Sequence, residues 1–361
     1  MRRLAALIVG GGPAGSAAGI ALARAGIDAT ILERQAAPQD VVCGGFLGWD
    51  ALAALRGLGI DAAAMGARPI ARLRLVSAGD QAEAALPRAA AGLSRRALDA
   101  ALLAAAETAG VRVRRGQAVR SADLGRRCVR IHGSEEVQGD ALLLATGKHE
   151  LRGAARPRDT SADPIGLRTA LAPSPRLERA LDGIIELHLF DGGYAGLLLQ
   201  EDGKANLCLS AARRRLKTAG GIEGLIAALA DELPILAERL RDAEPGGWSA
   251  VSGVPYGWRA AATAPGIYRL GDQAAVIASL AGDGIAIALT SGKAAAEAIT
   301  AGRPAEGYQR AFSREARRPI AAAEVLRWAA EHPRPRAVVM GVLKRAPRLT
   351  GLAALLTRIA R

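Results

Sequence analysis

The hydrophobic positions at the start of the chain predict a strand, a helix and a second strand in close succession. An apolar run over residues 4–9 stops at three consecutive glycines, and small residues over 13–25 then show helical spacing up to Gly26. A second apolar run over 29–32 ends at Glu33. Short apolar runs bounded by turn residues are typical of buried strands, and a glycine just past a helical stretch marks its end.

Strand and helix patterns continue along the N-terminal half. The predicted helices span 49–58 and 94–109, and the predicted strands span 70–76, 82–86, 111–113, a three-stranded meander over 117–138, and 141–144. Ser94 is a suitable N-cap for the second helix, and Gly110 is a suitable end. Residues 41–48 are rich in glycine and predict a loop after the 29–32 strand.

The pattern changes between residues 152 and 255. Four prolines interrupt its start (Pro157, Pro164, Pro173 and Pro175), β-like runs follow over 184–190, 194–199 and 205–210, and helical spacing returns over 222–241. We interpret this segment as a second domain with an antiparallel sheet. A short strand over 267–270 and a long helix over 285–300 then complete the first domain, which is therefore discontinuous in sequence.

The first glycine turn carries the fingerprint Gly10-x-Gly12-x-x-Gly15. The first glycine permits the tight bend, the second lets a pyrophosphate touch the backbone, and the third lets the helix lie close to the sheet. The helix N-terminus attracts phosphate through its partial positive charge. Glu33 follows roughly 20 residues on, where a carboxylate can accept both ribose hydroxyls. These features predict a dinucleotide site, and a signal peptide at the same place would explain neither the glycines nor Glu33.

Composition narrows the class of protein. Of the 361 residues, 50% are hydrophobic and 3% aromatic, which allows one large core or two modest ones. No uncharged apolar run of membrane-spanning length occurs apart from the glycine-interrupted N-terminus, so we expect a soluble, cytoplasmic protein. Cys43, Cys128 and Cys208 match no zinc spacing and predict no metal site. Cys128 and Cys208 fall in alternating strands and are expected in the core.

The net charge of +13 is unevenly distributed, because residues 319–361 hold eight basic and two acidic residues. Apolar and basic residues alternate there and predict two short amphipathic helices separated by Pro347. Two interpretations stay open: a docked helix pair with a solvated face, or peripheral contact with an anionic membrane at its inner face. A nucleic-acid partner is not expected, since aromatic residues are scarce and no binding module is recognisable.

Residues far downstream indicate FAD as the dinucleotide. FAD is long, and its ribityl and flavin ends need groups beyond the first glycine turn. Asp272, at the end of a strand, can accept a ribityl hydroxyl. Gly282 and Gly284 open the long helix, so backbone amides can approach the pyrimidine edge of the flavin and stabilise negative charge there. No cysteine or histidine has an attachment motif, so we expect FAD to bind without a covalent bond.

Seven motifs are distributed over roughly residues 1–300: GGGPAG (10–15), ER (33–34), CGG (43–45), SRRALDAAL (94–102), ATG (145–147), GYAGLL (193–198) and GDQAAVIASLAGDGIAIAL (271–289). With them the chain resembles FAD-dependent oxidoreductases of the para-hydroxybenzoate hydroxylase and geranylgeranyl reductase type. The resemblance implies that Arg95 contacts FAD, that Val119 meets the adenine through its backbone, and that Asp272 holds the ribityl chain or pyrophosphate. The residues expected to bind FAD are Gly10, Gly12, Pro13, Ala14, Gly15, Glu33, Arg34, Cys43, Gly44, Gly45, Arg95, Val119, Thr146, Gly147, Asp272, Gly282, Asp283, Gly284 and Ile285.

Pattern and resemblance together predict an α/β fold. A Rossmann-like FAD-binding domain, in three layers with a parallel sheet and a β-meander, is expected to comprise residues 1–70, 91–152 and 256–318. A second, α+β substrate domain on an antiparallel sheet is expected to comprise 71–90 and 153–255. Residues 319–361 form the predicted basic helical tail.

The motifs leave the reaction open. The CGG run resembles the geranylgeranyl reductase loop beside the isoalloxazine, where the hydroxylases usually carry an arginine-bearing loop. The hydroxylases' Asp-Gly motif, linked to FAD and NAD(P)H binding, is replaced by residues 146–149, Thr-Gly-Lys-His, and Ser279 stands where a proline is common. Lys148 and His149 could meet a nicotinamide cofactor's phosphate or form a solvated turn. Cys43 and Tyr194 are the candidate catalytic residues.

Three functions follow as expectations. The first is an NAD(P)H-driven monooxygenase that hydroxylates a small hydrophobic substrate, aromatic or polyketide-like. The second is an FAD-dependent ene-reductase of isoprenoid lipids. The third, of another class, is a non-catalytic flavin-binding or electron-transfer protein. NAD(P)H is expected as a transient reductant, because the sequence shows no second nucleotide fingerprint.

Overall fold

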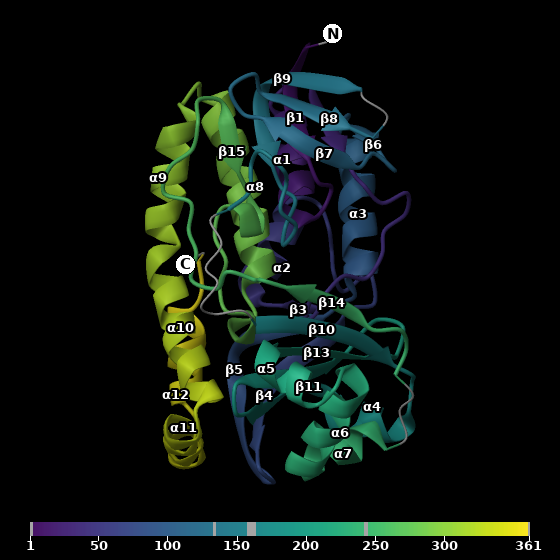
Figure 1. Ribbon diagram of the computed structural model, residues 1–361, viewed down its shortest axis with the longest axis vertical. Coiled ribbons are helices and arrows are strands. Elements are labelled where there is room, and N and C mark those ends of the chain that lie inside the picture. Colours follow the sequence, from purple (N-terminus) through teal and green to yellow (C-terminus); the bar gives the residue numbers. More distant parts are fainter. Residues whose placement is uncertain (1–2, 133–134, 157–163, 242–244, 360–361) are drawn as a thin grey trace.

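The structure is a computed structural model that describes residues 3–132, 135–156, 164–241 and 245–359. It contains two sheets, one towards each end of the view in Figure 1, and a column of helices beside both. The predicted fold class is confirmed, with a parallel sheet and meander in one half and a largely antiparallel sheet in the other.

The first sheet is built around β1, with the strand order β6-β2-β1-β9-β8-β7 and β15 beside β9. Its strands are β1 (Arg3–Val9), β2 (Ala29–Leu32), β6 (Arg112–Arg114), β7 (Val119–Asp123), β8 (Cys128–Ile131), β9 (Glu136–Leu144) and β15 (Ile267–Arg269). β6, β2, β1, β9 and β15 pair in parallel, and β7, β8 and the start of β9 form the antiparallel meander. The last meander strand and the 141–144 strand, which we predict as separate, are one strand, because β9 pairs with β8 at its start and with β1 over most of its length.

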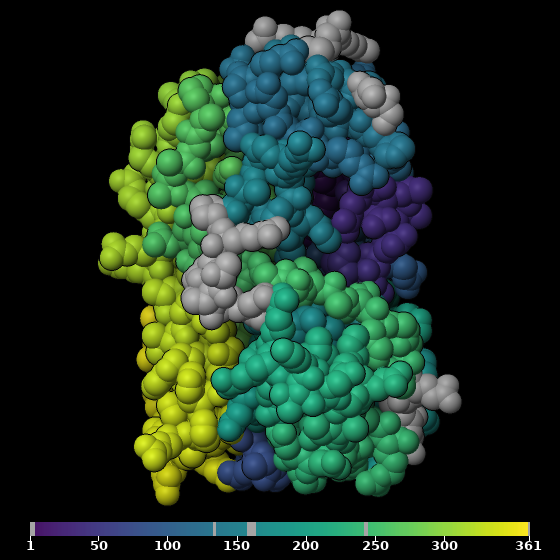
Figure 2. Space-filling view, in the orientation of Figure 1, coloured from purple at the N-terminus to yellow at the C-terminus, as the bar shows by residue number. Residues whose placement is uncertain are grey.

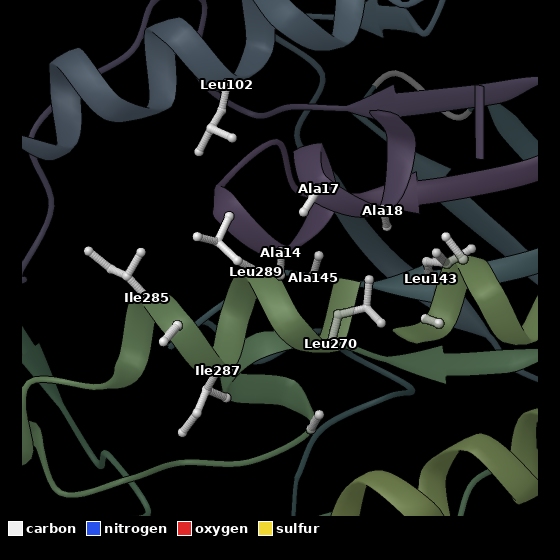
Figure 3. Close-up of a cluster of buried hydrophobic side chains, with 14 of the residues drawn as sticks. Ala14, Ala17, Ala18, Leu102, Leu143, Ala145, Leu270, Ile285, Ile287 and Leu289 are labelled. Atoms are coloured by element: carbon white, nitrogen blue, oxygen red, sulfur yellow. The ribbon is translucent and has the colours of Figure 1, made fainter. Parts of the chain in front are cut away.

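Side chains of β1 alternate between two buried layers. Ala6 and Ile8 pack with the helices α1 (Pro13–Arg24), α3 (Arg95–Thr108) and α8 (Gly284–Thr300), whereas Leu7 and Val9 pack with the meander. Small residues of α1 lie against Leu289 and its neighbours on α8 (Figure 3). The two helices approach so closely that a Cβ at Gly292 would lie 2.3 Å from the carbonyl oxygen of Ala14. This arrangement of helices, sheet and meander is the predicted three-layer domain.

The second sheet has the order β14-β10-β13-β12-β11-β4-β5-β3. Its strands are β3 (Phe46–Leu47), β4 (Arg68–Ser77), β5 (Asp80–Gly92), β10 (Pro164–Leu171), β11 (Gly183–Phe190), β12 (Gly193–Leu199), β13 (Ala205–Ala212) and β14 (Ser249–Ser252). All its pairs are antiparallel except β4 with β11. β10 begins at Pro164, where the sequence predicts only a break, because proline is tolerated at the first residue of a strand.

Among the other helices, one predicted helix is found as two. These other helices are α2 (Trp49–Gly57), α4 (Pro175–Leu181), α5 (Arg213–Thr218), α6 (Ile222–Glu232) and α7 (Pro234–Leu240), with short 3-10 turns at Gly271–Gln273 and Ser279–Ala281. The single helix predicted over 222–241 is divided into α6 and α7, because Pro234 has no amide proton to continue the ladder. Leucines of α4, α6 and α7 pack with β10, β12 and β13 in a separate core.

The C-terminal helices form the column beside both sheets (Figure 1). They are α9 (Ala305–Glu315), α10 (Arg317–Glu331), α11 (Pro333–Arg345) and α12 (Leu349–Leu356). α10 packs on β11 and β12, and α11 and α12 pack on β5. The predicted break at Pro347 lies between α11 and α12. Among the described residues, no helix combines the length and apolar character needed to cross a bilayer.

Candidate functional site

A cavity of about 680 Å³ lies between the two sheets, within the size range of small-molecule and cofactor sites. Its walls include the ends of β1, β2 and β9, the starts of α1, α3 and α8, and one face of β11, β12 and β13. The predicted residues that line it are Gly10, Gly12, Pro13, Ala14, Glu33, Arg34, Cys43, Gly44, Gly45, Arg95, Val119, Thr146, Gly147, Tyr194, Asp272, Gly282, Gly284 and Ile285. Two others, Gly15 and Asp283, do not line it.

The glycine turn has the close contacts that its fingerprint predicts. Gly10 has φ +107°, and a Cβ there would lie 2.4 Å from the carbonyl oxygen of Ala145. A Cβ at Gly15 would lie 1.9 Å from the carbonyl oxygen of Gly10, so this position acts through packing of α1 on the turn. Gly12 precedes the first residue of α1 and leaves the helix N-terminus open to the cavity.

Glu33 connects the end of β2 to the glycine turn. Its Oε2 accepts a hydrogen bond from the amide of Gly11 at 2.7 Å, and its Oε1 accepts from the amide of Gln35 at 2.8 Å. A carboxylate held this way at the mouth of the turn suits a ribose. The guanidinium of Arg34 next to it lies 2.9 Å from His149 Nε2. Burial and the charge of Arg34 lower the pKa of His149.

Arg95 projects from the start of α3 towards the same turn. Asp99, one helical turn further on, accepts two hydrogen bonds from the Arg95 guanidinium at 2.9 and 2.7 Å. Burial alone would lower the pKa of Arg95, but the Asp99 charge outweighs it and raises the pKa, so the guanidinium stays charged. A Cβ on Gly12 would lie 3.4 Å from Arg95 Nη2, which places a fixed positive charge beside the helix N-terminus.

The loop that carries Cys43, Gly44 and Gly45 is bound to the second sheet. The Asn206 side chain, on β13, donates hydrogen bonds to the carbonyls of Cys43 (3.0 Å) and Gly44 (2.8 Å). Arg168 on β10 donates to Asp40 Oδ2 at 2.9 Å and to Asn206 Oδ1 at 2.8 Å. The end of this loop, predicted to be irregular throughout, is strand β3, since Phe46 and Leu47 pair with β5.

The start of α8 faces the cavity through its backbone. Gly282 has φ +70° and, with Gly284 and Ile285, lines the cavity. The Asp283 side chain points elsewhere: its Oδ1 accepts from Arg358 Nη1 at 2.7 Å, and its Oδ2 accepts from the amide of Ile359 at 3.1 Å. Asp283 is therefore placed to hold the C-terminal segment, whereas the resemblance assigns it to the cofactor.

The remaining predicted residues lie along the nucleotide side of the cavity. Thr146 Oγ1 donates to the carbonyl of His149, and the carbonyl of Gly147 accepts from Gln273. Asp272 lies 3.5 Å from Lys148 Nζ. Burial alone would lower the pKa of Lys148, but the Asp272 charge raises it above its usual value. Lys148 is thus a cavity cation and not part of a freely solvated turn.

Three hydroxyls meet at the substrate side of the cavity. The Tyr194 hydroxyl donates to Ser279 Oγ at 2.6 Å, and Tyr256 Oη lies 2.7 Å from the same oxygen. Burial raises the pKa of both tyrosines. Tyr194 comes from β12, Ser279 precedes α8, and Tyr256 follows β14. The sequence shows Tyr194 as a candidate and Ser279 as a departure from the family, but nothing in it indicates that the two hydroxyls bond.

Cys208 corrects a further expectation. The alternation of β13 predicts a core residue, but Cys208 lines the cavity. Burial raises the pKa of its thiol to about 12, so the thiol stays protonated. Cys128 is buried in the first sheet, as expected. Among the described residues, no group of three or more His, Cys, Asp or Glu side chains could hold a metal ion.

Residues 3–141 match the family model of the FAD binding domain. The chain therefore contains an FAD-binding domain. A sequence search of curated proteins finds no match. Among solved structures, the chain is similar to a geranylgeranyl bacteriochlorophyll reductase-like protein from Thermoplasma acidophilum, with a TM-score of 0.81, 18% identity, and 98% and 95% of the two chains covered.

Other solved structures share the fold. The flavin-dependent brominase Bmp2 aligns with a TM-score of 0.80 and 18% identity over 99% of this chain and 93% of its own. A flavoprotein/dehydrogenase from Cytophaga hutchinsonii aligns with a TM-score of 0.77 and 16% identity over 98% and 99% of the two chains. At these identities the likeness establishes the fold alone.

The residues present fit FAD. The open N-terminus of α1 and Arg95 can hold the pyrophosphate, Glu33 can accept ribose hydroxyls, and Asp272 can accept a ribityl hydroxyl. The backbone at Gly282 and Gly284 can meet the flavin end, beside the Cys43 loop. The cavity is continuous across all of these groups.

Proposed function

We propose that this flavoprotein reduces a carbon–carbon double bond of a hydrophobic, isoprenoid-like substrate, with NAD(P)H as the reductant of FAD. When bound, FAD supplies the two-electron chemistry of such a reduction. The double bond gains the equivalent of a hydride at one carbon and a proton at the other. The protein must therefore bind an apolar chain and supply a proton.

The observation that carries this proposal is the substrate side of the cavity. Its described lining from β11–β14 consists of Ile185, Leu187, Tyr194, Gly196, Leu198, Cys208, Leu209, Ser249, Ala250 and Val251. None of these residues is an acid, a histidine or a lysine. Hydroxylation of a phenol is helped by a base that removes the phenol proton, whereas this wall offers donors that burial keeps protonated.

Tyr194 is the proton donor in this proposal. The residue is 7% exposed, and the raised pKa of its phenol keeps the proton on it at neutral pH. After Tyr194 has given its proton to the substrate carbon, the Ser279 hydroxyl can donate a proton to the Tyr194 oxygen. Ser279 can then take a proton from the Tyr256 hydroxyl. Tyr256 is less buried than Tyr194, so the chain of three hydroxyls leads outwards. Each oxygen gives up one proton and receives one, and solvent returns the last proton to Tyr256.

Lys148 is the proposed contact for the nicotinamide dinucleotide. It lies 3.5 Å from Asp272 Oδ2, and its side chain is 30% exposed, so a phosphate can reach it. Replacement by Met should raise the KM for NAD(P)H and leave FAD binding intact. The hydride donor then acts as a transient partner, in agreement with the single dinucleotide fingerprint.

A monooxygenase, which the sequence places first, is the second candidate. The apolar wall would also suit an aromatic or polyketide-like substrate and would exclude water. The whole-length similarity to a flavin-dependent brominase adds support, because in that protein the same fold serves a flavin chemistry other than double-bond reduction. Hydroxylation would consume oxygen and NAD(P)H together and needs no proton donor at Tyr194.

The deciding experiment is an anaerobic turnover with NAD(P)H and an isoprenoid alkene in deuterated water, followed by mass spectrometry. We expect a product with one solvent-derived deuterium, and a Tyr194→Phe variant about 100-fold slower with unchanged FAD content. Tyr268→Phe is the matched control, because the Tyr268 hydroxyl bonds the carbonyl of Arg303, outside the cavity. An oxygen-dependent hydroxylated product without loss of the double bond would establish the second candidate instead.

A further inference from the structure

The large apolar side chains that the structure exposes are confined, within its described residues, to the last three helices. They are Val325, Trp328, Val338, Val342, Leu349, Leu352, Leu355 and Leu356, with exposed fractions from 41% to 65%. We call them the apolar face of the tail. Exposed apolar patches of this kind mark a surface that binds another protein or a membrane. In Figure 2 the C-terminal helices, in yellow, form a continuous column along one edge of the molecule.

Helical spacing places basic side chains on the same face. On α11, Arg334, Val338, Val342 and Arg345 are separated by four, four and three residues, and all four are exposed. Residues at these separations lie on one side of a helix. The other side of α11 buries Met340. The exposed stripe therefore has an apolar middle and a positive charge at each end.

The charge of this segment has one sign only. Residues 333–361 contain seven basic residues and no acid. Arg334, Lys344, Arg345 and Arg348 are exposed among the apolar side chains. A second copy of this chain would bring two positive faces together, so self-association through them is opposed by repulsion. An anionic surface is the complementary partner.

The face is held rigidly against the body of the protein. Arg336 bonds Asp191 at 2.6 Å, and Arg358 bonds the buried Asp283 at the start of α8. Ala330, on the inner side of α10, packs with Leu187 and Tyr194, which line the cavity. α10 thus contacts cavity-lining residues on its inner side and exposes Val325 and Trp328 elsewhere on its surface.

We propose that the apolar face of the tail docks this protein on an anionic lipid bilayer. Leucine, valine and tryptophan side chains would enter the interface between headgroups and acyl chains, while the arginines would pair with headgroup charges. Trp328 suits this position, because tryptophan concentrates at membrane interfaces. Docking of this surface is independent of which reaction takes place in the cavity.

The test is co-sedimentation of the full FAD-loaded chain with vesicles. Binding is expected to vesicles of phosphatidylcholine with phosphatidylglycerol, to be much weaker with phosphatidylcholine alone, and to weaken with salt. The double variant R345E/R348E should bind at least about tenfold more weakly, since each basic residue near an anionic membrane surface strengthens binding about fivefold. L352E/L355E should also lose binding. All four positions are exposed or at the surface of the tail, so FAD content and circular dichroism should be unchanged.

R310E/R314E is the matched control. Both arginines are exposed, one helical turn apart on α9, and the change in net charge is the same as in R345E/R348E. Equal loss of binding in both double variants would overturn the proposal, because it would show attraction by overall charge alone. Failure of the folded wild-type protein to bind anionic vesicles would also overturn it. A dimer that forms without lipid and dissociates in L352E/L355E would instead identify a second copy of this chain as the partner of the apolar face.

Discussion

Arg358 is buried near the end of the chain, and its removal should destabilise the protein strongly. Its guanidinium lies 2.7 Å from Asp283 Oδ1 and 3.8 Å from Asp50 Oδ1, and it stands 4.5 Å from the ring centre of Trp49. Asp283 is 1% exposed and Asp50 is 7% exposed. An Arg358→Leu variant would keep apolar contact with Trp49 but leave two carboxylates buried side by side without their cation.

The expected loss is large. Removing one partner of a buried ion pair costs about 3–5 kcal/mol, because the other charge stays buried. The cation–π contact with Trp49 adds up to about 2 kcal/mol when desolvated. Part of this is recovered, since burial and the nearby Asp50 already raise the pKa of Asp283, and the variant can take up a proton there. A net loss of about 3 kcal/mol is therefore expected near neutral pH.

The pH dependence has a definite sign. A carboxyl group whose folded-state pKa is raised favours the folded state at low pH and loses that advantage as the pH rises through the raised pKa. The deficit of Arg358→Leu should consequently shrink as the pH is lowered from 8 towards 5 and grow as it is raised. Adding Asp283→Asn should restore much of the stability, because the amide oxygen can still accept from Ile359.

Urea unfolding, followed by circular dichroism and by flavin fluorescence, measures these differences. Arg345→Leu is the matched control, because Arg345 is an exposed arginine of the same tail and should change the unfolding free energy by under about 0.5 kcal/mol. If Arg358→Leu and Arg345→Leu lose the same amount, or if Asp283→Asn adds its own full cost to Arg358→Leu, the buried pair does not anchor the tail and the reasoning is wrong.

Three further predictions follow from the structure. Burial opposes ionisation of Glu186, but hydrogen bonds from His188 and two arginines lower its pKa to about 2. The ionised carboxylate therefore contributes about 3 kcal/mol to the free energy of unfolding above pH 4.5, and this contribution is lost as the pH falls to 2. In Glu186→Gln, the free energy of unfolding should depend less steeply on pH in that window. Gly15→Ala should abolish FAD loading, measured as flavin absorbance per protein, because its Cβ would overlap the turn, whereas Gly57→Ala, with open space around it, should load FAD normally. Arg95→Gln should weaken FAD binding by at least tenfold in fluorescence titration, with a smaller dependence on salt than the wild type, because one charge-assisted contact to phosphate is lost; an unchanged dissociation constant would remove Arg95 from the pyrophosphate site.

The nucleotide half could be predicted well because its signals are local. The glycine turn, α1 and Glu33 fall within a single run of about thirty residues, and each glycine has a steric reason that sequence spacing reveals. Errors arose where neighbours far along the chain decide the outcome. β9 continues through its two predicted parts because β8 and β1 both pair with it, and Cys208 faces the cavity because of where β13 lies in the second sheet.

The substrate side of the cavity could not be predicted from the sequence, because its contacts join residues that are far apart along the chain. The Tyr194, Ser279 and Tyr256 hydroxyls come from segments up to 85 residues apart, and only the fold brings them within hydrogen-bond distance. Asp283 shows the converse. Its motif position suggests a role at the cofactor, but its partner Arg358 lies 75 residues further on and turns the side chain away.

The attachment of the Cys43 loop to the second sheet would let a bound substrate affect the reactive end of the cofactor. The loop leaves the nucleotide half after β2, yet Arg168, Asn206 and the β3–β5 pairing fix it to the second sheet. Whatever shifts that sheet carries the loop with it, while the glycine turn and Glu33 keep their places on the first sheet. A substrate that settles against β12 and β13 would therefore alter the surroundings of the reactive end of the cofactor without disturbing its anchored end. The anchored end of the cofactor would then stay in place while its reactive end responds to the arrival of a substrate molecule.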